Sequence, residues 1–548
     1  MEVPKDSNAF YDNDSLTNRD IIPIPPERRT WTAFAYATYW AIEGVSISGY
    51  TTGSSLVGIG LSVKQSIACS VAAGIIYGIM AVVMGWIGSH HHIGFPLIAR
   101  FMYGIKGAPF GIVIRITTGI IWWGVQAVYG GEAIRVCLGA MSPSFLTWDT
   151  FNNKNGITSS TFVGLFLYCI FMIPCIRIPP EKLQFMFRVV MFITLGAFFG
   201  LLGYSVKSAG GAGTMFNAPS TTYKTRSSLA WACVKGIFSI VGTTGTGILG
   251  QSDFTRYSKR KHSPVLAQLI GAPVALTFSC VIGIITTSCA NDYLGYIQWN
   301  PVNLLGDIQQ HEHNSSAARA GVFFGGLAFV LQQMAINLLL NTLSSSMDMV
   351  GLWPKYINIM RGSTIVMIVG ILIWPWKILS SAKAVIIFGS GWGCFCSAQT
   401  GIIIAKYYII YKRKVLLKDL YINSKDSIYW FYHGVDWRSL VAFVIGTVFL
   451  MPGLALDVDD KSSSFWTGIY KVSYAWGLFI SMGVIISLHL LFPKISVSPV
   501  TKVDDVYTDD GTPIAWADES ESSEGLVEEV EVHIESKGDT FNYSKLEA

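Results

Sequence analysis

Charged residues are scarce in this sequence. Only 14% of its 548 residues are charged and 51% are hydrophobic, whereas soluble domains carry about 25% charged residues. Residues 65–88 contain no charge, and none lies between Arg319 and Asp348. About 20 apolar residues are enough to cross a bilayer. The chain is therefore predicted to be a polytopic membrane protein.

Several motifs of catalysis and targeting are also missing. The sequence has no GxxxxGK[ST] loop to cradle phosphates, so ATP is not expected to drive the protein. No apolar span carries a cluster of His, Asp and Glu with the spacing of metal ligands, which argues against an enzyme and against a metal or cofactor. The polar N-terminus lacks a basic and then apolar leader with a cleavage site, so no cleaved signal peptide is expected.

Cysteine is present without a zinc or redox motif. The nine cysteines all lie in or beside apolar segments, and Cys394 and Cys396 are separated by a single residue, which fits neither kind of site. We predict that all nine pack as small apolar side chains. The histidine run at 90–92 is expected to lie in a loop at the membrane interface and not to bind a metal.

Long apolar segments are what the sequence has most of, and they predict twelve membrane-spanning helices in an all-α protein. The predicted spans are residues 33–57, 65–88, 110–138, 161–178, 183–206, 229–250, 264–289, 320–347, 362–380, 382–410, 439–456 and 466–492. The ninth is interrupted by the stretch WPWKI. We expect the spans to form one transporter domain over residues 31–495, between tails at 1–30 and 496–548.

Lysine and arginine are concentrated in alternate loops. If the N-terminus is cytoplasmic, the inside segments include the basic clusters at 28–29, 259–261 and 412–414, and the outside loops hold fewer basic residues. By the positive-inside rule, both termini are predicted to be cytoplasmic. The net charge of +15 over residues 1–500 follows from these loops and does not indicate nucleic-acid binding.

The C-terminal segment has the opposite charge. Residues 501–548 contain 14 acidic residues and 3 lysines, a net charge of −11. Such a segment is too polar to form a core and is predicted to be disordered. It is interpreted as a solvating tail, or alternatively as a tail for trafficking or turnover.

Polar side chains inside the spans are the main functional signal, because they cost free energy unless they face protein or a water-filled cavity. Trp122 and Gln126 are four residues apart and share a helix face. An indole beside an amide would give a flat polar ring a stacking wall and a hydrogen-bonding edge, although Gln126 alone could simply bond a neighbouring helix. Asn337 and Asn341 repeat this spacing, with Gln333 one turn earlier. Together these amides favour a shared polar cavity.

Spans 1 and 6 are each interrupted near the middle by Gly, Ser and Thr, at residues 44–49 and 242–245. Broken helices in corresponding positions of two five-span halves indicate a transporter's binding site near the membrane midplane. Glu43 lies at the first break. Desolvation there favours a neutral carboxyl, which suits proton exchange; the alternative role is to cap exposed backbone.

The third span carries charges as well. Glu132 and Arg135 are one helical turn apart and are predicted to form an ion pair. Arg115, near the other end of the span, is predicted to extend to the membrane interface.

Four stretches together resemble the fungal uracil/allantoin permease branch of the nucleobase–cation symporter-1 family, over residues 16–493. They are LTNRDIIPIPPERRTW (16–31), WWGVQAVYGG (122–131), QSDFTRYSK (251–259) and SSSMDMVGLWPKYINIMRG (344–362). The resemblance implies a LeuT-like fold, in which two inverted repeats of five spans are followed by two C-terminal spans. Spans 1 and 6 would be broken, and spans 3 and 8 would line the site.

The resemblance also implies roles for particular residues. Trp122 would stack on a heterocycle, and Gln126 and Asn341 would hydrogen-bond its carbonyl and N–H edges. Glu43 corresponds to an acid common in fungal members and is the predicted proton carrier. The predicted substrate-binding set is completed by Asn337, Thr243 and Thr244.

Two departures from the family pattern bear on coupling and specificity. Ala335 and Ile336 stand where sodium-coupled relatives supply hydroxyls, which argues for proton coupling. Thr243 and Thr244 stand where uracil permeases tend to have Asn-Phe, so a second aromatic wall is missing.

The predicted function is that of a proton symporter in the plasma membrane, which imports a small planar heterocycle such as uracil, allantoin or a related nucleobase. A permease for thiamine, a nucleoside or nicotinamide riboside is an alternative, but the thiamine and nicotinamide riboside permeases tend to lack the Trp-x-x-x-Gln pair. A further alternative is a sensor of the same fold that binds a nutrient without transporting it; only the acidic tail supports this interpretation.

Overall fold

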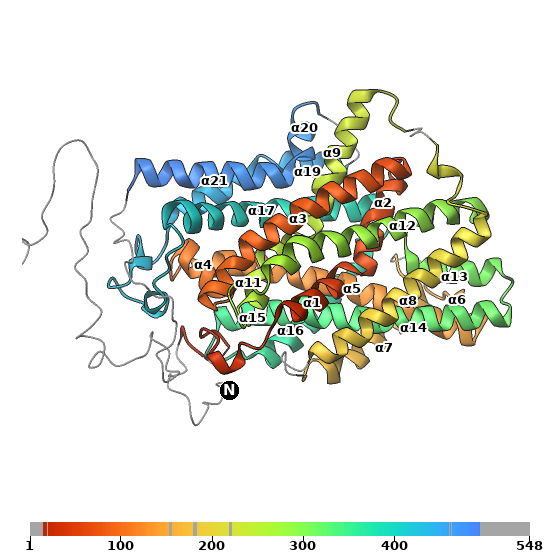
Figure 1. Ribbon diagram of the computed structural model, residues 1–548, viewed down its shortest axis with the longest axis horizontal. Helices are drawn as coiled ribbons and strands as arrows, with labels where there is room; N and C mark the ends of the chain where they lie inside the picture. Colours follow the sequence, from red (N-terminus) through yellow and green to blue (C-terminus); the bar gives the residue numbers. More distant parts are fainter. Residues whose placement is uncertain are drawn as a thin grey trace, which may run out of the picture.

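The computed structural model describes residues 15–18, 20–152, 156–178, 183–218, 222–459, 461 and 463–493. In this part of the chain, helices form one elongated bundle (Figure 1), and the only β-structure consists of two isolated bridges. The predicted acidic tail at 496–548 lies outside the described residues.

In the described part of the chain, twelve spans build the bundle, as the hydropathy pattern predicts. Spans 1 to 6 are α1 (Ala33–Gly44) with α2 (Ile47–Gly58), α3 (Val63–His91), α5 (Ala108–Met141), α7 (Ser159–Cys175), α8 (Leu183–Ala209), and α9 (Arg226–Thr243) with α10 (Gly245–Leu249) and α11 (Gln251–Thr255). Spans 7 to 12 are η4 (Ala267–Gly271) with α12 (Ala272–Leu294), α14 (Ser316–Ile336) with η5 (Asn337–Leu343) and α15 (Ser344–Leu352), α16 (Ile359–Leu372), α17 (Ala382–Ile404) with η7 (Ala405–Ile410), α18 (Trp437–Val448) with α19 (Met451–Val458), and α20 (Trp466–Lys471) with α21 (Ser473–Leu491).

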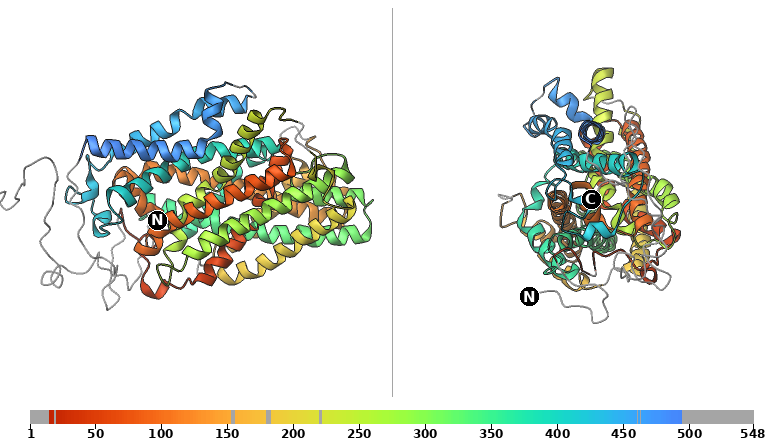
Figure 2. Two further views of the ribbon diagram at one scale, coloured as in Figure 1. Left: turned by 45° about the horizontal axis from the view of Figure 1, so that its top comes forward. Right: turned by 90° about the vertical axis from the view of Figure 1, so that its left-hand side faces the viewer.

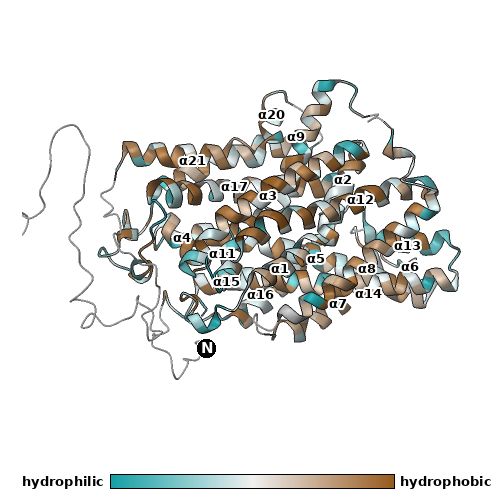
Figure 3. Ribbon diagram, viewed as in Figure 1, coloured by the Kyte–Doolittle hydropathy of each residue, from teal (hydrophilic) through white to brown (hydrophobic). Residues whose placement is uncertain are grey.

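Length and composition explain why these segments cross a membrane. Among the described helices, eight are long and apolar enough to do so, and α7 and α16 are shorter apolar helices. These eight, the two shorter helices and the two broken spans make twelve. Apolar residues follow the length of the helices, and hydrophilic residues gather in the loops at both ends of the bundle (Figure 3). Two short helices, α4 (Phe95–Tyr103) and α13 (Pro301–His311), lie at opposite ends.

Spans 1 and 6 are broken where Gly, Ser and Thr predict it. In span 1 the α-helix stops at Gly44 and resumes at Ile47, and the Ser46 hydroxyl caps the second half by accepting from Gly49 N at 3.1 Å. A side chain at position 44 would lie 2.4 Å from the Ala275 Cβ. Glycine therefore lets the break pack directly against α12. Span 6 is interrupted at Thr244 and again at Gly250.

The part of the predicted N-terminal tail that the structure describes is packed against one end of the bundle. Asn18 Nδ2 donates to Pro354 O at 2.9 Å, and Ile24 N donates to His92 O at 3.0 Å. These bonds tie the motif that precedes span 1 to the ends of spans 2 and 8.

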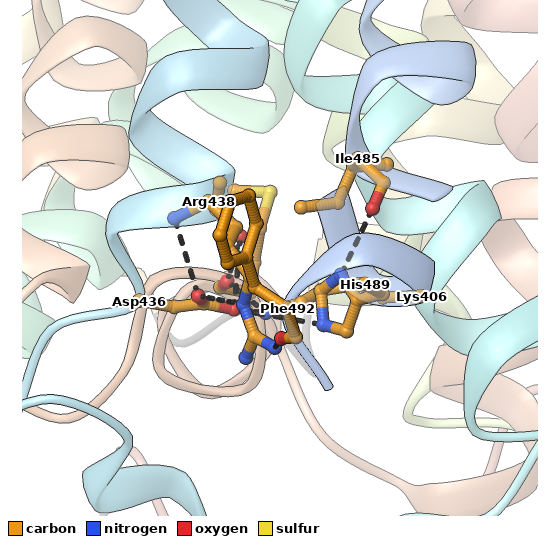
Figure 4. Close-up of polar contacts among 8 residues, drawn as sticks. Lys406, Asp436, Arg438, Ile485, His489 and Phe492 are labelled. Carbon is orange, nitrogen blue, oxygen red and sulfur yellow. Dashed lines mark hydrogen bonds and ion pairs between the residues drawn. The ribbon is translucent and has the colours of Figure 1, made fainter. Parts of the chain in front are cut away.

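Spans 11 and 12 lie along one side of the bundle and pack on α17 (Figures 1 and 2). A buried charge cluster joins span 11 to the η7 end of span 10 (Figure 4). Asp436 accepts from Lys406 Nζ at 2.6 Å and from Arg438 Nε at 2.8 Å. Burial alone would raise the pKa of Asp436, but the charges and hydrogen bonds of Lys406 and Arg438 lower it to about 2. Arg438 also donates to Phe492 O at 3.0 Å, which fixes the end of α21.

Candidate functional site

A small cavity of about 100 Å³ lies where both helix breaks meet α5 and the middle of span 8. Six of the seven predicted site residues line it: Glu43, Trp122, Gln126, Thr243, Thr244 and Asn341. These residues come from spans 1, 3, 6 and 8, so folding gathers side chains that are far apart in the sequence.

Trp122 presents an aromatic ring to the cavity, and its neighbour Trp123 does not. The Trp122 ring meets the Phe388 ring of α17 edge-on, with centroids 5.1 Å apart and planes at 62°. Trp123 is fully buried on another face of α5 and donates from Nε1 to Thr342 Oγ1 at 3.0 Å. Of these two tryptophans, Trp122 is therefore the one with a face available for stacking on a ligand. Phe388 was not predicted from sequence, because nothing in span 10 distinguishes it from its apolar neighbours.

The side-chain amide of Gln126 is hydrogen-bonded through its nitrogen, and its oxygen is unpaired. Its Nε2 donates to Ser48 Oγ at 2.8 Å, and Ser48 lies in the first turn of α2, directly after the first break. Its Oε1 is buried without a hydrogen-bond partner. An unpaired buried polar atom costs about 1–3 kcal/mol, and this one belongs to a cavity-lining side chain, where a ligand can satisfy it.

Asn341 lines the cavity, whereas Asn337 lies behind it. Asn341 Nδ2 donates to Asn337 Oδ1 at 3.0 Å. Asn337 in turn donates from Nδ2 to Trp123 O at 3.1 Å and to Tyr168 Oη at 3.3 Å. Span 8 is π-helical over η5, and π-turns are frequent at functional sites. Asn337 therefore orients Asn341 through the hydrogen bond that joins them and does not itself line the cavity.

Thr243 and Thr244 bring hydroxyl oxygens to the cavity from the break in span 6. The Thr243 hydroxyl donates to Ile240 O at 2.7 Å, and the Thr244 hydroxyl donates to Val241 O at 2.9 Å. Because each hydroxyl hydrogen is used within the helix, both oxygens can offer only lone pairs to a ligand.

Glu43 lies beside the cavity with one carboxyl oxygen bound and the other unpaired. The Tyr77 hydroxyl donates to Glu43 Oε1, and the buried Oε2 has no partner. A side chain at Gly247 would lie 2.9 Å from that Oε1, so glycine in α10 lets span 6 approach the carboxyl. Tyr77 was not predicted as a site residue; the available signal was a tyrosine within the charge-free segment 65–88.

A buried ion network closes one side of the cavity. Arg115 pairs with Asp253 of α11 and, at 3.0 Å, with Asp348 of α15. The Ser344 hydroxyl, which lines the cavity, accepts from Arg115 and donates to Asp253 at 3.3 Å. Arg115 is 1% exposed, so the prediction that it extends to the membrane interface is wrong. Its partners lie in distant spans that the local sequence does not reveal.

At the other end of α5, the predicted ion pair between Glu132 and Arg135 is not formed. Glu132 Oε2 accepts from Asn300 Nδ2 at 2.8 Å, and Arg135 Nη2 donates to Asn303 Oδ1 at 2.9 Å. The two asparagines belong to the start of α13, and they separate the charges. These bonds fasten α13 to the end of span 3.

Comparison with known proteins places this geometry in a family. Residues 23–477 match the family model described as "Permease for cytosine/purines, uracil, thiamine, allantoin". The chain is 29% identical to the allantoin permease of Saccharomyces cerevisiae, over 93% of this chain and 80% of that protein. It is 30% identical to a thiamine transporter of the same yeast, over 96% of this chain and 86% of the relative.

A solved structure shares the fold. The chain superimposes on Mhp1, a nucleobase–cation symport-1 family transporter solved in a closed conformation with bromovinylhydantoin bound, with a TM-score of 0.70. The alignment covers 88% of this chain and 98% of Mhp1 at 18% identity. Two inverted repeats of five spans with two additional C-terminal spans are thus the architecture of this protein. The chain belongs to the nucleobase–cation symporter-1 family, whose fungal permeases carry small heterocycles across membranes.

Proposed function

We propose that this protein imports a small planar heterocycle, such as uracil or allantoin, together with protons. The observation that carries the proposal is the cavity at the two helix breaks, where the Trp122 ring lies beside the unpaired Gln126 Oε1. A flat ring could stack on the indole while its polar edge satisfies the amide.

The size and polarity of the cavity support a single-ring ligand with N–H groups. Pockets for drug-sized ligands occupy about 300–1,000 Å³, and this cavity has about 100 Å³. Gln126 Oε1 and Glu43 Oε2 lack donors, and the oxygens of Thr243 and Thr244 can only accept. Uracil and allantoin both present ring N–H groups to such acceptors.

Thiamine, a nucleoside and nicotinamide riboside are the alternative substrates. The 30% identity to a thiamine transporter favours thiamine, whereas the small cavity favours a ligand without linked rings. The proposal of a sensor that does not transport rests on the acidic tail, which lies outside the described residues.

Proton coupling is proposed from the residues at the end of α14 and at the first break. Ala335 and Ile336 are buried and have no side-chain oxygen with which to bind sodium. Glu43, with one free carboxyl oxygen beside the cavity, is the proposed proton carrier. The distribution of basic residues supports an orientation with both termini in the cytoplasm, and the plasma membrane is the proposed location.

Uptake into a cell that lacks the corresponding transporters tests the function. Labelled uracil and allantoin are each offered alone and against unlabelled uracil, allantoin, cytosine, uridine, thiamine and nicotinamide riboside. We expect saturable uptake of one of the two labelled compounds, with little competition from thiamine or the nucleosides. Strong inhibition by thiamine would contradict the assigned substrate class, and binding without accumulation would support the sensor.

A further inference from the structure

A second, larger hollow lies between α8 and α14 and shares no residue with the substrate cavity. It has a volume of about 830 Å³. The two helices lie side by side in the bundle (Figure 1), and α13 contributes Leu305 and Ile308 to the same wall. The groove is therefore bounded by spans 5 and 8 and by the loop helix that is fastened to α5.

Four glycines line the groove, and at three of them no part of the described chain packs against the glycine; the fourth, Gly325, faces Leu305. A Cβ added at Gly196, Gly200 or Gly321 would meet no atom within 4 Å. By contrast, a Cβ at Gly164 of α7 would lie 2.1 Å from Gly131 O of α5, which is the close helix packing that small residues usually serve in membranes. The three groove glycines keep space open instead.

The groove faces the lipid side of the bundle. Phe324 on its rim is 68% exposed, and Ile193 is exposed at its far end. An apolar hollow that opens on hydrocarbon is filled by hydrocarbon at little cost, because lipid tails are as apolar as its walls. From Ile193 to Tyr204 the helix rises about 16 Å at 1.5 Å per residue, which matches one leaflet of a hydrocarbon core about 30 Å thick.

Opposite charges lie together at one end of this apolar groove. Lys207 and Glu312 both line it, and the Glu312 side chain is 42% exposed. The Tyr204 hydroxyl donates to Glu312 Oε1 at 2.7 Å and so holds the carboxylate at the mouth. A cation and an anion that line the same groove complement a headgroup that carries both signs, since phosphate suits lysine and an ammonium group suits a carboxylate.

We propose that this groove binds one phospholipid with a zwitterionic, primary-ammonium headgroup, of which phosphatidylethanolamine is the representative. An acyl chain lies along the glycines of α8 and α14, the phosphate contacts Lys207, and the ammonium group donates to Glu312. Bound in this way, the lipid bridges α8, α14 and α13 and stabilises the end of the bundle at which α13 covers span 3.

Native mass spectrometry of the purified full chain with added phosphatidylethanolamine tests the site. Gly200→Leu and Gly321→Leu fill the groove from its two sides. Gly203→Leu is the matched control, because position 203 is on the same helix, also has no atom within 4 Å of a Cβ, and does not line the groove. We expect one lipid per monomer in the wild type and the control, and at least a tenfold lower occupancy in the two groove variants.

A second measurement separates lipid binding from folding. Thermal unfolding without lipid should be alike in all variants, and added phosphatidylethanolamine should raise the unfolding temperature only where the groove is open. Glu312→Gln should remove the preference for phosphatidylethanolamine over phosphatidylglycerol. Equal lipid occupancy in Gly200→Leu and Gly203→Leu would overturn the site, as would preferential retention of a sterol. A wild-type dimer that Gly200→Leu separates would assign the groove to a second copy of the chain.

Discussion

At the scale of single residues, proposed recognition depends on the unpaired oxygen of Gln126 and on Asn341. We predict that Gln126→Ala and Asn341→Ala each abolish high-affinity uptake while the protein still reaches the membrane. Each change removes a partner for a polar edge of the ligand, worth about 1–3 kcal/mol, or about 5- to 150-fold in affinity. Uptake kinetics alongside surface labelling measure both quantities, and normal apparent affinity in either variant would remove that residue from the site.

The two adjacent tryptophans should respond differently to substitution. Trp122→Ala should raise the apparent Michaelis constant strongly and Trp122→Phe less so, because stacking needs an aromatic face. Trp123→Ala should instead reduce the amount of folded protein, because deleting a buried tryptophan costs about 3–5 kcal/mol and Trp123 also bonds Thr342. Uptake kinetics normalised to surface protein distinguish the two effects. If only Trp123→Ala altered the Michaelis constant, the proposed face of α5 would be incorrect.

Residue positions were predictable where a polar group stands out from an apolar span. Trp122, Gln126 and Asn341 were found in this way, and the structure places all three at one cavity. Tyr77, which lines the cavity, and Phe388, which packs on Trp122 without lining it, were missed, because an aromatic residue in a membrane helix gives no local sign of what it faces. Their positions depend on how distant helices pack, which one sequence does not specify.

At the scale of elements, close approach at the first break depends on glycine. A Cβ at position 44 would lie 2.4 Å from the Ala275 Cβ and 2.7 Å from its carbonyl carbon, so Gly44→Ala must push α1 away from α12. Overpacking of this kind typically costs about 1–3 kcal/mol. We predict a lower unfolding temperature for purified Gly44→Ala and an unchanged or higher one for Gly196→Ala, where nothing lies within 4 Å. Similar unfolding temperatures in the two variants would contradict the packing of span 1 on span 7.

The breaks were predictable, but the contacts that hold the elements together were not. Gly, Ser and Thr within an apolar run mark a broken helix from local sequence alone. Arg115 was predicted to face the interface and instead pairs with Asp253 and Asp348, which lie more than a hundred positions away. Glu132 was predicted to pair with the nearby Arg135, but it accepts a hydrogen bond from Asn300 at the start of α13 instead. Local charge patterns do not reveal partners supplied by a distant element.

At the scale of the whole molecule, hydropathy was sufficient to place the twelve spans, because apolar length decides which segments enter a membrane. It does not determine which ion drives transport. That depends on whether the oxygens near the midplane suit a metal ion or a proton. In this chain Ala335 and Ile336 supply no side-chain oxygen, and Glu43 supplies a carboxyl with one oxygen that has no hydrogen-bond partner.

Uptake should therefore be independent of sodium and should fall as the external pH rises, because fewer molecules then carry a proton at Glu43. Glu43→Gln mimics the neutral carboxyl permanently. We expect this variant to bind substrate but to lose accumulation against a gradient, with a flat pH profile. Glu132→Gln is the matched control, since Glu132 is held by Asn300 away from the cavity, and it should keep the wild-type pH dependence.

The competing role for Glu43 is to cap the broken backbone of span 1. Glutamine can still accept a hydrogen bond, so in that case Glu43→Gln would preserve both accumulation and the pH profile. Concentrative uptake measured from mildly acidic to neutral external pH, with sodium and with potassium as the cation, separates the two roles. If Glu43→Gln kept wild-type accumulation and pH dependence, Glu43 would be ruled out as the carrier. If sodium stimulated uptake, the chain would bind a coupling sodium ion even though residues 335 and 336 have no hydroxyl.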